Sequence, residues 1–531
     1  MFQIKSKPVS KVAFLILTLV LSSSFALAEL NQVDPLAGDA KYVFYMIGDG
    51  MASVQIHAAE AYLASIDVND IDDPTLNKSY DLAMNSYLPY IGMQKTWAWN
   101  QLITDSAAAG TALACGYKTY VGAISVDPED PNVAYKTLAE LAKDQGKKVG
   151  ILSSVSLDHA TPAVFYAHQD SRNKYFHIAQ EAANSGTIDF IGGGSFRYID
   201  GYTGSRAESW PELAAGDPNV VNLWTQFENN GFTVVHDLND LISVPAGSKC
   251  VAASDNTQDS AAMHYELDRP ASGEWSLAEV TTEAIRLLDN PDGFFMMVEG
   301  GKIDWTCHAN DALTSIYDTL AFDDACRVVI EFANQHPGEC LIVVTADHET
   351  GGLTQGWAGT KYDSSYQNLT TQSMSYQSFG EYLAEYQEDP YSLWNIMRVV
   401  LELFGPADAE LTALNLSDDI EMQSMIQGAF GLVYSDLTEL QQAQLEEAYD
   451  REMTGEEIRG SEEDYLIYGG YSPLTVACTH IINARAGLAW TSYSHTAVPV
   501  PVMANDPSFN GYYDNTDVAK KIAAAMGGSL Y

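Results

Sequence analysis

The feature that most constrains this chain is an apolar run, Leu341–Thr345, which leads into an adjacent carboxylate and imidazole, Asp347 and His348. A β-branched run of this kind predicts a buried strand of a parallel sheet. In open α/β sheets the ligand site lies beyond the carboxyl ends of the strands. An acid and a histidine at that edge can share a metal ion. The run therefore predicts both a fold class and a site.

Four further apolar runs predict buried strands, at residues 42–47, 149–153, 190–192 and 294–298. Between them lie helical patterns at residues 134–145, 277–288 and 314–335. Strand, crossover helix and strand in alternation are typical of a doubly wound sheet. We therefore predict an α/β fold with a mostly parallel central sheet flanked by helices.

The first 28 residues predict a signal peptide. Lys5, Lys7 and Lys11 precede an apolar stretch at 12–21, and Ala26-Leu27-Ala28 fits a cleavage site. We expect residues 1–28 to be removed and residues 29–531 to form one exported α/β domain, periplasmic or secreted. A retained membrane anchor is the less favoured alternative, because the stretch is short for a bilayer span.

The charge balance narrows the partners. The chain carries 27 basic and 71 acidic side chains, a net charge of −44, and loss of the three leader lysines makes it −47. Such an excess of acid argues against binding nucleic acid or anionic membranes. Export permits one or two disulfides among six cysteines, whose spacing fits no zinc ribbon. They are Cys115, Cys250, Cys307, Cys326, Cys340 and Cys478.

Residues 357–475 predict a long insertion in the domain. The segment is rich in Tyr, Gln, Ser and acidic residues, with helical periodicity at 392–404 and 437–451 and no strand-like run. An excursion of this length is usually functional or an interaction element. The segment can pack against a second subunit or act as a simple lid, and a disordered spacer is the least favoured of its possible roles.

Acids and histidines follow other predicted strands as well. Asp49 stands between two glycines after the first strand, and Glu299 ends the fourth. Asp304 and His308 are four residues apart, so on a helix they share one face and can hold one metal. A Gly-Asp-Gly alone is more often a turn. Their shared place at one sheet edge favours a metal constellation instead.

A serine stands where an alanine-rich helix is predicted to begin. Asp105 and Ser106 precede residues 107–114 and fit either a helix cap or a phosphate-binding helix N-terminus. As a nucleophile the serine needs an activator, and a metal is the plausible one because no Gly-x-Ser-x-Gly elbow occurs. Arg172 can clamp two phosphate oxygens. Taken alone, Arg172 would be interpreted as a surface residue and His495 as a structural residue.

Together these motifs resemble those of the alkaline phosphatases. Asp-Ser-Ala at 105–107, Val-Glu-Gly at 298–300, Thr-Ala-Asp-His-Glu-Thr-Gly-Gly at 345–352 and Ser-His-Thr at 494–496 occur in the order of that family. The resemblance covers residues 42–353 and resumes at 478–526. It implies hydrolysis of phosphate monoesters at alkaline pH through a phosphoserine intermediate, two zinc ions, one magnesium ion and a homodimer.

The resemblance also implies roles for single residues. Ser106 matches the nucleophile, Arg172 the phosphate clamp and Asp105 the residue that orients this arginine. The implied metal ligands are Asp304, His308 and His495 for one zinc, Asp347, His348 and Asp49 for the second, and Glu299, Thr161 and Asp49 for magnesium. His159 and Trp305 stand where many bacterial relatives carry Asp and Lys. This pair resembles a marine-bacterial branch and affects magnesium affinity and water-mediated phosphate contacts.

Three alternatives to a monoesterase are weighed against these residues. A sulfatase needs a Cys/Ser-x-Pro-x-Arg motif, which the sequence lacks. A phosphodiesterase of the same metal-dependent superfamily usually carries threonine as its nucleophile and no arginine clamp, so Ser106 and Arg172 favour monoesters. A non-catalytic metal-binding scaffold is least favoured, since the nucleophile and ligand set are intact.

Overall fold

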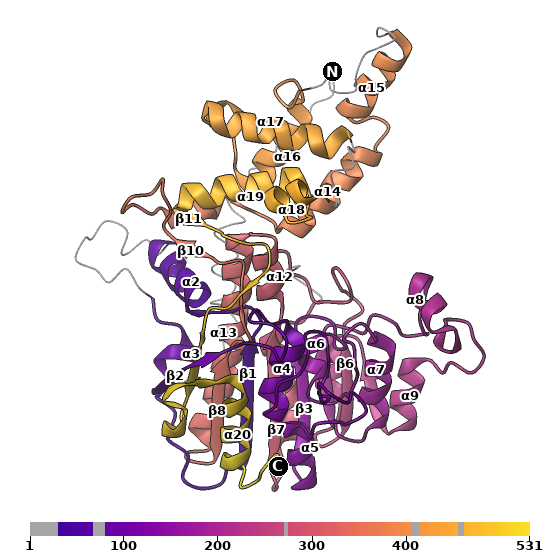
Figure 1. Cartoon of the computed structure of the whole chain (residues 1–531), viewed down its shortest axis with the longest axis vertical. Coiled ribbons are helices and arrows are strands. Elements are labelled where there is room, and N and C mark those ends of the chain that lie inside the picture. Colours follow the sequence, from indigo (N-terminus) through magenta and orange to yellow (C-terminus); the bar gives the residue numbers. More distant parts are fainter. Residues whose placement is uncertain (1–29, 67–79, 270–273, 405–414, 455–460) are drawn as a thin grey trace.

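The computed structural model describes residues 30–66, 80–269, 274–404, 415–454 and 461–531, so the signal peptide predicted at 1–28 lies outside the described residues. The described chain forms a sheet domain, in the lower part of Figure 1, and a group of helices above it. Within these residues, no helix is both long enough and apolar enough to cross a membrane.

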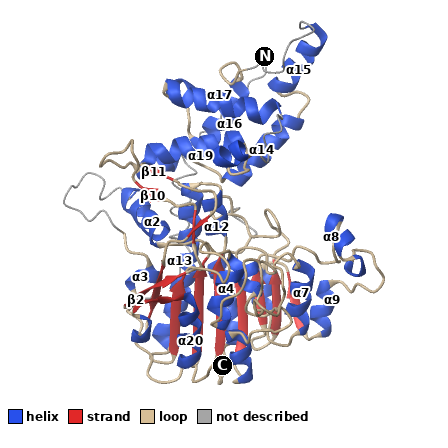
Figure 2. Ribbon diagram, in the orientation of Figure 1, coloured by secondary structure: helices blue, strands red, loops and turns tan. Residues whose placement is uncertain are grey.

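One large sheet organises the lower part of the molecule (Figure 2). Its ten described strands have the order β14-β2-β13-β8-β1-β7-β3-β4-β6-β5. Their bounds are β1 Tyr42–Gly48, β2 Tyr90–Lys95, β3 Lys148–Ser153, β4 Phe190–Gly193, β5 Phe232–Val235, β6 Lys249–Ala253, β7 Phe294–Gly300, β8 Cys340–Thr345, β13 Val500–Ala504 and β14 Gly511–Asp514. The strands from β8 to β5 pair in parallel, and β13 is antiparallel to both β8 and β2.

The five strands predicted from apolar runs are confirmed as β1, β3, β4, β7 and β8. All residues of β1, β7 and β8 are buried, as expected for strands covered on both faces. Strand β1 lies between β7 and β8, with Ile47 in register with both Glu299 and Thr345. Asp49, Glu299 and Asp347 therefore reach the same sheet edge.

Helices cover both faces of this sheet, as the doubly wound prediction requires. One face packs against α2 (Ser53–Ile66), α11 (Leu277–Leu288) and α13 (Ala312–Gln335). The other packs against α4 (Ser106–Cys115), α5 (Leu138–Asp144), α7 (Tyr175–Asn184) and α20 (Asn515–Ala525). The predicted helices at 277–288 and 314–335 are thereby confirmed, and the helix predicted at 134–145 is shorter.

The helical group has a core of its own. It consists of α14 (Tyr376–Glu388), α15 (Leu393–Phe404), α16 (Ile420–Phe430), α17 (Glu439–Thr454), α18 (Glu462–Tyr468) and α19 (Pro473–Ala486). The helices predicted at 392–404 and 437–451 are present. Helix α19 packs into this core through Leu474, Cys478 and Ile481, so the core extends past the expected end of the insertion at residue 475. A short pairing of β11 (Leu488–Ala489) with β10 (Thr354–Gln355) closes the excursion.

All six cysteines are buried and unbridged. The structure therefore contains none of the one or two disulfides that export would permit. Cohesion rests on the two cores at the faces of the sheet and the third core among the helices.

Gly193 at the end of β4 has a left-handed backbone, with a φ of +129°. A Cβ atom there would overlap the carbonyl oxygen of Ser153 on β3. We expect Gly193→Ala to lower the free energy of unfolding by about 3 kcal/mol or more, from backbone strain plus overlap. Urea denaturation monitored by circular dichroism measures this change.

Gly186 is the matched control, because its φ is +76° and no atom lies within 4 Å of an added Cβ. Gly186→Ala should cost only about 1 kcal/mol, from the backbone alone. Equal losses in the two variants would show that the close approach of β4 to Ser153 is unimportant.

Candidate metal centre and nucleophile

Three carboxylates lie at the shared strand edge with no exposed surface: Asp49, Glu299 and Asp347. Both carboxylate oxygens of Asp49, Oδ2 of Asp347 and Oε1 of Glu299 accept no hydrogen bond from any described residue. An ionised carboxylate without a partner is costly in a protein interior. Such a cluster is suited to cations, which would compensate its charge.

The acids also repel one another. Burial, and next the charge of Asp347, raises the pKa of Asp49 well above its ordinary value. Burial raises the pKa of Asp347 to about 7 and that of Glu299 to about 8. Divalent cations would favour the ionised forms and lower these pKa values again.

The acids and histidines gather into three groups, in each of which the candidate ligand atoms lie within 4.8 Å of one another. The groups are Asp304, His348 and His495; Asp49, Asp347 and His348; and Asp49, His159 and Glu299. The structure thus brings together the residues named for the second zinc. It also places His159 among the possible ligands of the third ion.

The remaining predicted ligands lie beside these groups. His308 Nε2 is 3.1 Å from His495 Nε2 and 3.3 Å from Asp304 Oδ2. Thr161 is buried and close enough to Glu299 to lower the pKa of that carboxyl. Oxygen and nitrogen atoms that can bind a metal therefore surround each candidate metal position.

Helix α12 (Lys302–His308) supplies the predicted one-turn spacing of Asp304 and His308. Burial opposes both charges, but their attraction outweighs it. The attraction between Asp304 and His308 holds the pKa of Asp304 well below its usual range and raises the pKa of His308 to about 8. Without metal, a carboxylate and an imidazolium thus stabilise each other here.

Backbone carbonyls orient two of the histidines. His308 Nδ1 donates to the carbonyl of Tyr493 at 2.6 Å, and His495 Nδ1 donates to the carbonyl of Thr104 at 2.8 Å. Because Nδ1 donates in each ring, Nε2 is the nitrogen left to bind a cation when the ring is neutral. His348 directs its own Nε2 toward Ser106 Oγ, 3.2 Å away.

Ser106 is the first residue of α4, which confirms the helix predicted to begin there. Asp105 caps this helix by accepting a hydrogen bond from the Ala108 amide at 3.0 Å. Ser106 is almost fully buried, at 2% exposure. The amides of the first turn and the helix dipole favour an anion at this position.

Arg172 reaches the same place from a loop. Its Nη1 donates to Asp105 Oδ2 at 3.0 Å, and its Nη2 lies 3.0 Å from His159 Nε2. Burial opposes the charge, but Asp105 raises the pKa of Arg172, so the guanidinium stays ionised. The ring of Trp305 stands edge-on to His159, with centroids 5.8 Å apart.

Two residues that hold the candidate metal ligands were not predicted from the sequence. The hydroxyl of Thr350 donates to Asp304 Oδ1 and lies 3.2 Å from His348 Nδ1, so it links two groups. Ser153, at the end of β3, donates to Glu299. Thr350 stands within the Thr-Ala-Asp-His-Glu-Thr motif, and Ser153 ends a predicted strand. Their places in the sequence could therefore have marked both residues as neighbours of the site.

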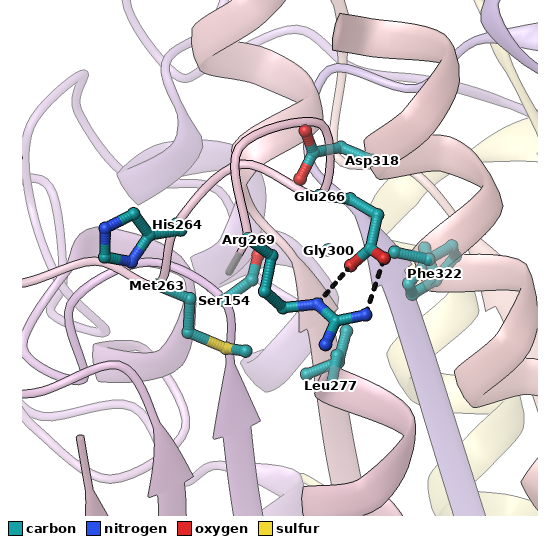
Figure 3. A pocket seen from close by; sticks show the side chains of 10 residues that line it. Ser154, Met263, His264, Glu266, Arg269, Leu277, Gly300, Asp318 and Phe322 are labelled. Atoms are coloured by element: carbon teal, nitrogen blue, oxygen red, sulfur yellow. Dashed lines mark hydrogen bonds and ion pairs between the residues drawn. The ribbon is translucent and has the colours of Figure 1, made fainter. Parts of the chain in front are cut away.

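A separate small cavity lies beside β7, lined by Ser154, His264 and Asp318 among others (Figure 3). Glu266 accepts two hydrogen bonds from Arg269 across it, at 2.7 and 2.8 Å. Its volume of about 20 Å³ holds about one water molecule. This cavity is too small for phosphate and shares no residue with the three candidate metal groups.

Comparison with known proteins agrees with this geometry. The family model described as alkaline phosphatase matches residues 40–527. Alkaline phosphatase 4 of Bacillus subtilis is 30% identical, over 98% of this chain and 96% of its own length. The crystal structure of a cold-active alkaline phosphatase from the psychrophile Shewanella sp. is 27% identical, with a TM-score of 0.68 over 91% of this chain and 99% of that one. Thermus thermophilus alkaline phosphatase shares the fold, with a TM-score of 0.71 at 24% identity and coverage of 94% and 93%.

The position of Thr350 makes a specific prediction. Thr350→Val keeps the side-chain shape but removes the hydroxyl between Asp304 and His348. We expect metal affinity or activity to fall about 10- to 100-fold, as for other groups that orient metal ligands. Metal content after dialysis against a zinc buffer, measured by mass spectrometry, tests this.

Thr225→Val is the control, since Thr225 is exposed on α9 (Leu223–Asn229). That variant should retain the metal content and activity of the parent. Unchanged zinc affinity and activity in Thr350→Val would contradict the role of this hydroxyl.

Proposed function

This chain belongs to the alkaline phosphatase family, and we propose that it hydrolyses phosphate monoesters at alkaline pH through a phosphoserine on Ser106. The observation that carries the proposal is the position of Ser106. Its hydroxyl lies 3.2 Å from His348, at the start of a helix whose cap, Asp105, binds Arg172. Nucleophile, phosphate clamp and candidate metal ligands converge there.

The donor chemistry fits two zinc ions and one magnesium ion. The groups around Asp304 and Asp347 combine imidazole with carboxylate, as zinc prefers. Glu299, Asp49 and Thr161 offer oxygens, as magnesium prefers, and His159 adds a nitrogen to this third group. Bound divalent cations supply Lewis-acid activation of the serine hydroxyl and neutralise charge on the transferred phosphoryl group.

The chain's own residues account for the positioning of the substrate. Arg172 donates two parallel hydrogen bonds to non-bridging phosphate oxygens while Asp105 fixes its guanidinium. Ser106 Oγ attacks phosphorus opposite the ester oxygen, the P–O bond to the alcohol breaks, and the alcohol leaves with a proton. Water then cleaves the Ser106–phosphorus bond, which returns the hydroxyl and releases inorganic phosphate.

We also propose export and self-association. The lysines and apolar stretch within residues 1–28 support a periplasmic or secreted location. A homodimer in which the 357–475 insertion contacts the second subunit is supported by α15. On that helix Ile396, Val399 and Val400 are 44%, 46% and 42% exposed. Apolar side chains so exposed on one helix are typical of an interaction surface.

Removal of metal tests the proposed reaction. We expect the chain lacking residues 1–28 to hydrolyse an aryl phosphate monoester at alkaline pH, to lose that activity to a chelator, and to regain it with zinc and magnesium. Ser106→Ala should lower turnover by about 10⁴-fold or more, since it removes the nucleophile. Its metal content should equal that of the parent.

A diester of the same aryl alcohol, assayed beside the monoester, separates the alternatives. A metal-replete protein that cleaves only the diester would favour a phosphodiesterase. A metal-replete protein inactive on both substrates would favour a scaffold.

Charges placed on the exposed face of α15 test the proposed interface. The double substitution Val399→Asp and Val400→Asp places two charges on the exposed face of α15. We expect it to weaken dimerisation by about tenfold or more, because burying unpaired charge in an interface is costly. Sedimentation velocity over a dilution series measures the change. Val221→Asp, at a residue 46% exposed on the sheet domain, is the control, and equal dissociation constants for all three proteins would exclude α15 from the interface.

A further inference from the structure

Asn310, two residues after the end of α12, has a left-handed backbone with a φ of +53°. Helices often end with a residue in this conformation, and it is usually glycine and only sometimes asparagine. Glycine would meet the same backbone requirement without steric cost. The backbone alone therefore does not account for an asparagine at this buried position, and its side chain needs a separate explanation.

The side chain of Asn310 joins three segments of the chain. Its Nδ2 donates to the carbonyls of Cys307 and Ser492, both at 2.9 Å. Its Oδ1 can only accept, so Nε2 of His480, 3.1 Å away, is the donor. Burial lowers the pKa of His480 to about 4, so this ring is neutral. The amide of Asn310 thus connects α12, the segment at 492–495 and α19, and Asn483 of α19 also donates to its carbonyl at 2.7 Å.

The segment at 492–495 carries two groups of the candidate metal centre. The carbonyl of Tyr493 accepts from His308 Nδ1 at 2.6 Å, and His495 is itself a candidate ligand. Ser492, which Asn310 binds, immediately precedes Tyr493. The hydrogen bond from Asn310 to Ser492 therefore fixes how far this segment lies from the end of α12.

Helices α18 and α19 contact the same segment through side chains. The rings of His480 and Tyr493 are stacked, with centroids 6.0 Å apart and planes 21° apart. The hydroxyl of Tyr493 donates to the carbonyl of Ile467 in α18. The hydroxyl of Tyr465, also in α18, lies 2.7 Å from Ser494 Oγ. The helical group therefore holds the segment from which a candidate ligand comes.

We propose that Asn310 is a positioning residue for one zinc ion, and that α19 acts on this zinc through Asn310. The zinc is the one assigned to Asp304, His308 and His495, so the inference rests on the proposed function. Two histidines bind one cation well only at a suitable separation, which the amide of Asn310 maintains. The ligands proposed for the second zinc, Asp49, Asp347 and His348, come from neither segment, so the effect is selective.

Asn310→Gly removes the amide and keeps the left-handed backbone, so the fold should be retained. Zinc content of the zinc-loaded protein, equilibrated with a series of zinc buffers and measured by mass spectrometry, gives the dissociation constants. We expect the constant of one zinc ion to rise at least about tenfold, and that of the other to stay within about twofold. Cobalt(II) exchanged into the weakened site should show altered d–d absorption, which reports a changed ligand geometry.

Asn395→Ala is the matched control. Asn395 is also buried, and its Nδ2 also donates to two backbone carbonyls, those of Gln387 and Asp389, at 2.8 and 2.9 Å. It belongs to α15, at the end of the helical group that lies away from the sheet (Figure 1). This variant should keep both zinc dissociation constants within about twofold, even where its free energy of unfolding falls.

His480→Phe tests the part of α19. It keeps a ring beside Tyr493 but removes the hydrogen bond to Asn310, and it should raise the same zinc dissociation constant at least about threefold. No effect of this variant would exclude α19 from the inference.

Unchanged zinc binding in Asn310→Gly, or an equal loss in Asn395→Ala, would overturn the inference as a whole. Because zinc binding is measured without a substrate, a parent protein that binds both zinc ions but cleaves no phosphate monoester would overturn the proposed function alone.

Discussion

The structure depends on one electrostatic constraint: three carboxylates with no exposed surface meet where β1, β7 and β8 end. Asp49, Glu299 and Asp347 are brought together by the parallel register of strands far apart in sequence. Their mutual repulsion and loss of hydration oppose folding unless cations compensate. Cation binding at this edge would therefore stabilise the fold, and the strand register that brings the acids together also places the candidate metal ligands.

The second requirement is to hold ligands that come from separate elements. Thr350 hydrogen-bonds Asp304 and meets His348, while β12 (His495–Thr496) pairs with β9 (Glu349–Thr350) and thereby carries His495 to the site. Thr496 donates to Glu349 across that pairing. A two-residue ladder is a weak element alone, so these side-chain bonds fix the distances among the ligands.

The sequence predicted the parts of this architecture that leave a local pattern. Strands buried on both faces appear as apolar runs, so β1, β3, β4, β7 and β8 were recognisable. Strand β2 was not, because only Gly92 and Gln94 of its six residues are buried and Gln94 hydrogen-bonds Thr345 inside the sheet. His159 was linked from the sequence to magnesium affinity and to phosphate contacts, but not named as a ligand, and it groups with Asp49 and Glu299. That proximity depends on the loop after β3, which no periodicity describes.

The insertion and the metal centre meet at the end of α12. Asn310 donates to the carbonyls of Cys307 and Ser492, and Asn483 of α19 donates to the carbonyl of Asn310. His308, two residues earlier, is oriented by the carbonyl of Tyr493. Hydrogen bonds therefore connect the helices above the sheet to the candidate metal ligands below, although these helices contribute none of those ligands.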